Sequence, residues 1–264
     1  MTIKAYNMKV IVSGGVYEFY RYEDTMFRGY EQKRSSGSSN TFYDSEGIAM
    51  RIDPETGEMI PKALESRGRS NIRARNELRR LALTNFSNRS KFITLTFKEN
   101  MQDIGAANKL FKEFTRELRK RQPDLKYIAV IEFQKRGAIH YHLLCNLNYI
   151  SAKVLENTWG NGFVKINRID HVDNIGAYVI KYMTKEDADP RLVGKKMYQT
   201  SRNLERPIEW VGKQAEYLYE QMKREQRKAV YSSSYENKQT ANQIHYEEYN
   251  LQRSQALKEV NTIS

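Results

Sequence analysis

The 264-residue sequence has little cysteine and no long apolar run. Its single cysteine, Cys145, excludes a disulfide bond within the chain, which suits a reducing compartment. No apolar stretch approaches the roughly 20 residues of a membrane-spanning helix, and the N-terminal region lacks the apolar segment of a signal peptide. Neither Gly194-Lys195 nor Gly212-Lys213 has the earlier glycine or the following Ser or Thr of a phosphate-binding loop. We therefore expect a cytoplasmic protein with no membrane partner and no ATP-driven motor activity.

Acidic residues are outnumbered by basic ones. The chain has 44 Lys and Arg against 32 Asp and Glu, a formal net charge of +12. More than half of this excess lies between Lys62 and Lys91, where nine basic residues stand against two acidic ones. Because positive charge favours a polyanionic partner, we expect nucleic acid. Residues 64–86 are predicted to form a basic helix, which is either a solvated charged face or a contact with the DNA backbone through Arg73, Arg75, Arg79 and Arg80.

Hydrophobic periodicity in the central part of the chain predicts alternating strands and helices. Between Phe92 and Ile169 the predicted order is strand, helix, strand, strand, helix, strand, and a further helix follows over 174–185. This order is that of the ferredoxin-like split βαβ arrangement, an α+β fold in which helices cover one face of an antiparallel sheet. The other face is expected to stay open and to carry the catalytic residues.

Composition divides the rest of the chain. A β-hairpin is expected over 1–30, and the Ser- and Gly-rich residues 33–40 are expected to form a flexible loop. The polar segment from Tyr231 to Ser264 is expected to be a loosely held tail. The predicted organisation is an N-terminal hairpin and loop extension over 1–60, a basic helical segment over 61–90, a catalytic domain over 91–210, and a C-terminal helix with a partly disordered tail over 211–264.

Two histidines lie two residues apart on a strand predicted over 138–144. Side chains at i and i+2 of a strand point to the same face, so His140 and His142 project together. Such a pair also occurs by chance on protein surfaces. By itself the pair is therefore weak evidence for a metal site.

The register of the predicted hairpin adds a carboxylate to this pair. With 135–137 as a three-residue loop, Gln134 pairs with Ala138 and Glu132 falls opposite His140. Two imidazoles and one carboxylate suit Mn²⁺, Fe²⁺ or Zn²⁺, and a site open to water suits catalysis. Mg²⁺ uses such a site when phosphate and water complete its shell.

A second candidate group lies on the helix predicted over 174–185. Tyr178, Lys181, Tyr182 and Lys185 stand at i, i+3, i+4 and i+7, so they form one stripe. Such a stripe can hold a phosphate and attack it, because a nearby cation favours the phenolate, the stronger nucleophile. The alternative is a pair of half-buried aromatic rings covered by lysine side chains.

Three motifs in this order resemble those of the rolling-circle replication initiators of the HUH endonuclease superfamily. They are the aliphatic and threonine strand at 92–97, the stretch from Glu132 to His142, and Tyr-x-x-Lys-Tyr at 178–182. The resemblance looks closest to the Rep proteins of small single-stranded DNA phages and related plasmids. It covers 91–210, including Met197 to Pro207, which is similar to a segment that follows the catalytic helix in such proteins.

The resemblance implies a divalent metal ion, Mg²⁺ or Mn²⁺. His140 and His142 would bind it with Glu132 as the third ligand. Gln134 is an alternative or additional ligand.

The resemblance also implies that Tyr178 is the nucleophile, that Lys181 is its basic partner and that Tyr182 is the second tyrosine of the two-tyrosine subgroup. Attack on single-stranded origin DNA would leave a 5′-phosphotyrosine and a free 3′-OH, which a host polymerase and helicase would use in a bacterial cell. Further expected DNA contacts are Lys135, Arg136, Lys185 and Arg202.

Other functions stay open at this point. A plasmid-mobilisation relaxase or a single-strand transposase would use the same chemistry. A ferredoxin-like nucleic-acid-binding module without activity is the alternative from another class. A closed structural zinc site is disfavoured, because one cysteine and the two other histidines, His171 and His245, do not make a tetrahedral set.

Overall fold

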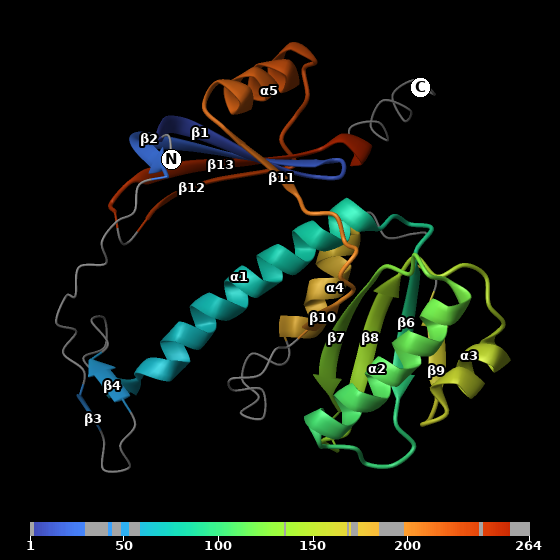
Figure 1. Ribbon diagram of the computed structural model, residues 1–264. Helices are drawn as coiled ribbons and strands as arrows, with labels where there is room; N and C mark the ends of the chain where they lie inside the picture. Colours follow the sequence, from blue (N-terminus) through green and yellow to red (C-terminus); the bar gives the residue numbers. More distant parts are fainter. Residues whose placement is uncertain are drawn as a thin grey trace, which may run out of the picture. The chain divides into compact units, whose positions relative to one another are not determined.

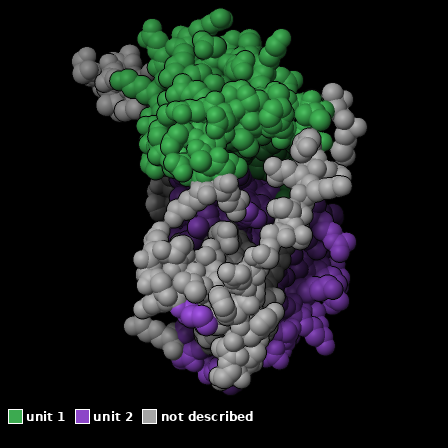
Figure 2. Space-filling view, turned by 90° about the vertical axis from the view of Figure 1, so that its left-hand side faces the viewer, with its two compact units in different colours: residues 1–35, 205–264 green, residues 36–204 purple. Residues whose placement is uncertain are grey.

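The computed structural model divides the chain into two compact units, which we describe separately (Figure 2). Met1–Ser35 and Glu205–Ser264 make up the smaller unit, and Ser36–Leu204 is the larger unit. The structure describes residues 3–29, 42–43, 49–52, 59–134, 136–167, 169, 174–184, 198–237 and 240–253. Within these residues, no helix has the length and apolar character needed to cross a membrane.

The larger unit is built on a five-stranded antiparallel sheet with the order β10-β7-β8-β6-β9 (Figure 1). Along the chain, the order β6, α2, β7, β8, α3, β9 is the one predicted, and the α+β split βαβ fold is confirmed. Strand β10 is added at one edge. The elements are β6 (Lys91–Thr96), α2 (Ile104–Arg121), β7 (Tyr127–Phe133), β8 (Ile139–Cys145), α3 (Ala152–Trp159), β9 (Val164–Asn167) and β10 (Tyr198–Thr200).

Helices α2 and α3 cover one face of this sheet (Figure 1). Phe111, Phe114 and Leu118 recur at helical spacing on α2, so one stripe of the helix is apolar and buried. The Phe111 ring stacks on Tyr141 of β8 with 4.4 Å between centroids, and Phe114 meets Trp159 of α3 edge to face at 5.5 Å. This aromatic layer fixes the sheet against its helices.

The opposite face, which we call the histidine face because it carries His140 and His142, is covered in part by a helix. We expected helices on one face only, but α4 (Ile175–Thr184) packs against β7 and β8, and α1 (Lys62–Asn85) packs on α4. The reason is the apolar stripe of α4, in which Val179 is 1% exposed, because such a stripe must be buried against a partner.

The contact between α1 and α4 is closest at Gly176. A Cβ atom there would lie 2.8 Å from Cγ and 2.9 Å from the carbonyl oxygen of Arg79. Gly176→Ala should therefore destabilise the larger unit by about 1–3 kcal/mol, because the added methyl group forces the helices apart. Urea denaturation measures this. The control is Gly105→Ala, where the added methyl meets only the Asp103 carboxylate, at 3.2 Å; equal midpoints for the two variants would contradict the prediction.

A three-stranded antiparallel sheet precedes α1 in the chain. Its strands are β3 (Phe42–Tyr43), β4 (Ala49–Ile52) and β5 (Met59–Pro61). The flexible loop predicted over 33–40 lies outside the described residues.

The smaller unit is a second antiparallel sheet, with the order β11-β1-β2-β13-β12 and the helix α5. The predicted N-terminal hairpin is present, since Ser13 pairs with Val16 across its turn. Phe19 contacts Tyr219 of α5 and Tyr249 of β13 edge to face, and these rings form the core of the unit. The elements are β1 (Lys4–Ser13), β2 (Val16–Arg28), β11 (Ile208–Val211), α5 (Lys213–Arg224), β12 (Tyr231–Glu236) and β13 (Gln243–Asn250).

The structure differs from the prediction of a loosely held C-terminal tail. Residues 231–250 contribute two strands, and β13 pairs with β2 from Ile244 to Asn250. The segment is polar on average, yet it buries Ile244 and Tyr249 while its backbone completes the edge of the hairpin. The hairpin and the C-terminal segment therefore belong to one unit rather than to two separate extensions.

Candidate active site

The hairpin β7-β8 has the predicted register. Glu132 lies opposite His140. The loop is closed by the N–H of Gln134, which donates to the carbonyl of Ala138 at 2.8 Å. Gly137 has a φ of 87°, in the region that favours glycine, so the short turn needs it.

His142 is held from both sides of its ring. Nε2 lies 2.5 Å from Oε2 of Glu132, and Nδ1 lies 3.2 Å from the hydroxyl of Thr94. Thr94 stands directly opposite His142 on β6, and the histidine is only 6% exposed. Sequence reasoning did not assign Thr94 a role, although the Thr-x-Thr alternation of this strand placed it on a polar face.

His140 is the less occupied of the two histidines. Its Nε2 is buried and has no hydrogen-bond partner within the described residues. Burial and the neighbouring His142 lower the pKa of His140 against the opposing effect of Glu132, so the ring is held neutral. A neutral imidazole with a free nitrogen lone pair is the form that binds a metal ion.

The donor set fits a divalent metal ion by its chemistry, although the side chains are not gathered around one point. In the part of the chain that the structure describes, no group of three His, Cys, Asp or Glu side chains surrounds a common centre. The ring centroids of His140 and His142 are 6.4 Å apart. Gln134 Oε1 accepts a hydrogen bond from Arg136 Nε at 2.9 Å, so this oxygen is already engaged. The fit therefore rests on Glu132, the orphaned nitrogen of His140 and the oriented ring of His142.

Helix α4 brings its tyrosines to the histidine face. The Tyr182 ring stacks on His142 with 3.9 Å between centroids and 23° between planes. Phe92 of β6 lies beside both tyrosines, edge to face with Tyr178 at 4.8 Å and stacked with Tyr182 at 5.2 Å. Lys181 Nζ is 3.6 Å from the centroid of the Tyr178 ring. Residues from three separate elements thus meet at one site.

The two tyrosines have different surroundings. Burial, a hydrogen bond with Tyr178 and the charge of Glu132 raise the pKa of Tyr182. Tyr182 is therefore held protonated where it packs on His142. Tyr178 is half-buried and lies closer to Lys181, whose Nζ is 4.9 Å from the Tyr182 centroid.

The basic residues predicted to contact DNA lie on several elements. On α1, Arg73 is exposed, whereas the other three predicted arginines are partly buried, and Arg79 packs against Gly176. Arg136 donates to the carbonyl of Phe97 at 3.4 Å. Arg202 is exposed directly after β10. Lys135 and Lys185 lie outside the described residues.

If Arg73 contacts a phosphate, its charge should appear in the salt dependence of DNA binding. Arg73→Gln should then flatten the slope of log K against log salt by about 0.9 for duplex DNA or about 0.7 for a single strand. Fluorescence anisotropy over a salt series measures the slope. Arg116→Gln on α2, on the other side of the sheet, is the control; equal slopes for both variants would assign Arg73 to a solvated face.

The fold and the site define an α+β protein whose split βαβ sheet carries His, Glu, Tyr and Lys side chains on one face. Residues 90–187 match the family model of the replication-associated protein ORF2. This stretch runs from β6 through α4 and contains every residue of the site. No curated protein and no solved structure shows significant similarity to the chain. The match supports a replication-associated protein of the Rep type, with DNA as its partner.

Proposed function

We propose that the chain is a rolling-circle DNA replication initiator with HUH endonuclease chemistry, which nicks one strand at a specific site and rejoins it. One observation carries the proposal: α4 sets Tyr178 and Lys181 against the face that holds Glu132 and His142, within the stretch matched by the replication-associated family. A nucleophile beside a phosphate-binding face is what strand transfer requires.

Tyr178 is the first nucleophile in this proposal. Its phenolic oxygen attacks the scissile phosphorus and the bond to the 3′ oxygen breaks, giving a 5′-phosphotyrosine and a free 3′-OH. The phenol releases its proton to solvent, and the departing 3′ oxygen takes one up. Lys181, with Nζ 3.6 Å from the Tyr178 ring centroid, stabilises negative charge on the phenol. The covalent bond stores the phosphodiester, so rejoining needs no ATP.

Tyr182 acts second in this scheme. It follows one helical turn after Tyr178, and its raised pKa keeps it protonated during the first cleavage. When the junction is regenerated after synthesis, Tyr182 attacks it. The displaced strand is then closed into a circle by the 3′-OH.

Glu132, His140 and His142 would hold Mg²⁺ or Mn²⁺, with Gln134 as an alternative or additional ligand. Bound there, the ion supplies Lewis-acid polarisation of the scissile phosphate. Thr94 keeps the His142 ring in a fixed orientation, as hydrogen-bond partners of metal-binding histidines do.

A host polymerase would extend the 3′-OH and a host helicase would separate the strands, in the cytoplasm of a bacterial cell. The description of the matching family favours replication over plasmid mobilisation or transposition. The meeting of Tyr178 and Tyr182 with His142 favours an enzyme over a binding module without activity.

The test is incubation of the full chain with single-stranded DNA of its own replicon and Mg²⁺ or Mn²⁺. We expect a covalent protein–DNA adduct, and peptide mapping by mass spectrometry should place it on Tyr178. Nicking without an adduct would contradict the phosphotyrosine step. Binding without nicking would favour the non-catalytic module.

A further inference from the structure

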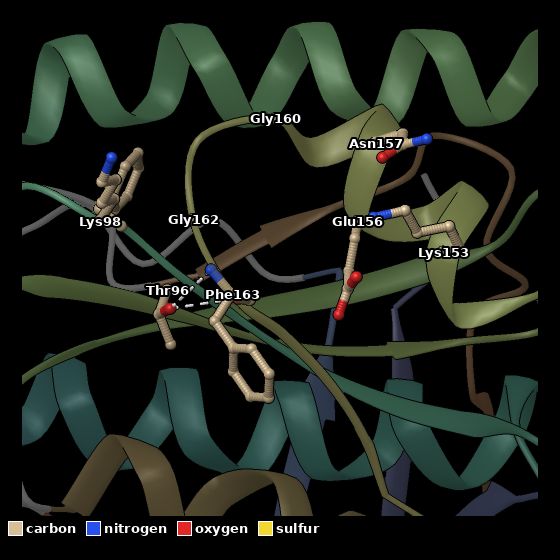
Figure 3. Close-up of a pocket in the computed structure, with 9 residues that line it drawn as sticks. Thr96, Lys98, Lys153, Glu156, Asn157, Gly160, Gly162 and Phe163 are labelled. Carbon is tan, nitrogen blue, oxygen red and sulfur yellow. Dashed lines mark hydrogen bonds between the residues drawn. The ribbon is translucent and has the colours of Figure 1, made fainter.

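A cavity of about 790 Å³ lies at the end of β6, between α3 and the loop that leads into β9 (Figure 3). Its charged lining residues are Lys98, Lys153 and Glu156, and Phe163 contributes an aromatic ring. In Figure 3, Lys98 and Lys153 stand on opposite sides of Phe163. We call this cavity the Phe163 pocket.

The Phe163 pocket adjoins the candidate active site through Thr96. Thr96 stands directly opposite His140 in the register of β6 and β8. On its other side it binds the backbone of Phe163, because its hydroxyl donates to the Phe163 carbonyl and accepts from the Phe163 N–H, both at 3.1 Å. One residue therefore separates the pocket from a proposed metal ligand.

Phe163 and Lys165 also share the histidine face. Lys165 pairs with Thr94, which pairs with His142, and directly opposed residues share a face. Phe163 precedes Lys165 by two residues and so projects to the same side. Lys165 is exposed on this edge strand.

The Phe163 ring is exposed although its backbone is fixed. The residue is 60% exposed. A Cβ atom at the preceding Gly162 would lie 2.4 Å from the carbonyl of Thr96, so the loop is pressed against β6. A rigidly held, exposed aromatic ring is the usual platform on which a nucleic-acid base stacks.

The surroundings of this ring are mainly cationic. Lys98 and Lys153 line the pocket, and Glu156 is the one acidic residue among the described lining residues. Arg136 reaches the same strand end, where its guanidinium donates to the Phe97 carbonyl. Cations around an aromatic ring suit a single strand, with its phosphates on the lysines and its base on the ring.

We propose that the Phe163 pocket binds one unpaired nucleotide of the DNA strand next to the scissile phosphate. The base stacks on Phe163, and the flanking phosphates contact Lys98 and Lys153. This inference rests on the proposed function and names the subsite by which the enzyme holds single-stranded DNA. A base can stack there only when it is unpaired, so the pocket selects single strands over duplex.

The test measures binding of a fluorescent single-stranded oligonucleotide to the full chain in EDTA, so that cleavage does not contribute. Phe163→Ala should weaken binding by about 5- to 100-fold, whereas binding of the same sequence as duplex should change by less than about 2-fold. Phe163→Trp should restore the affinity, because it keeps a stacking ring. An oligonucleotide with 5-iodouracil at successive positions should crosslink to Phe163 at one position.

Phe27→Ala is the matched control, since this phenylalanine of the smaller unit is 61% exposed and should bind like wild type. Wild-type affinity of Phe163→Ala, or an equal loss on duplex, would overturn the inference. The proposed function is judged separately by the Tyr178 adduct. If the adduct forms and Phe163→Ala binds normally, the pocket proposal alone fails; if no adduct forms and Phe163→Ala still loses single-strand binding, the pocket stands without the enzyme.

Discussion

Tyr178→Phe should abolish the covalent protein–DNA adduct, with a loss of more than about 10³-fold in the rate of adduct formation. The substitution removes one oxygen and keeps the ring that meets Phe92 edge to face, so the fold of α4 should be unchanged. Denaturing gel electrophoresis of the full chain with a 5′- or 3′-labelled origin strand measures the adduct. Binding of the uncleaved strand should stay within about 2-fold of wild type.

Two further tyrosine variants make this result specific. Tyr149→Phe is the control for an exposed phenol, since Tyr149 is 91% exposed and lies outside the site. Tyr182→Phe should keep the first adduct but lower the yield of closed circles, because it removes the second nucleophile. An undiminished adduct in Tyr178→Phe would refute the assignment, and an adduct lost only in Tyr182→Phe would exchange the two roles.

His142→Ala should lower strand cleavage by more than about 100-fold while single-strand binding in EDTA stays within about 2-fold of wild type. The imidazole is the group that links Glu132, Thr94 and Tyr182, so its removal takes away both a proposed metal ligand and the orientation of its neighbours. EDTA should have the same effect on wild type, and Mg²⁺ or Mn²⁺ should restore wild type but not the variant.

The matched control is His245→Ala, since His245 lies on β13 of the smaller unit. It should cleave like wild type. Circular dichroism of His142→Ala checks that the sheet is intact. Full cleavage by wild type in EDTA would exclude the metal role, and full cleavage by His142→Ala would exclude this residue from it.

The parts of the site fixed by local rules could be predicted from the sequence. A three-residue loop and the two-residue period of strands place Glu132 opposite His140, because both rules act within a dozen residues. The tyrosine stripe follows in the same way from the helical repeat. The order of strands and helices is sufficient for the split βαβ fold.

The parts that depend on distant packing could not be predicted in this way. The stacking of Tyr182 on His142 requires α4 to lie across β7 and β8, which the apolar stripe of α4 permits but does not specify. Thr94 gains its position only when β6 pairs with β8. The pairing of β13 with β2 joins residues more than 200 positions apart in a segment of polar composition, so no local pattern indicates it.

This pairing has a consequence for the order in which the chain folds during translation. The larger unit is one continuous segment, Ser36–Leu204, inserted between the two halves of the smaller unit. The ribosome therefore releases all of the larger unit before β13 is made, and at about 5–20 residues per second the hairpin β1-β2 waits many seconds for its neighbour strand. Until then the hairpin has an unpaired edge at β2, which makes it the segment of the nascent chain most dependent on chaperones.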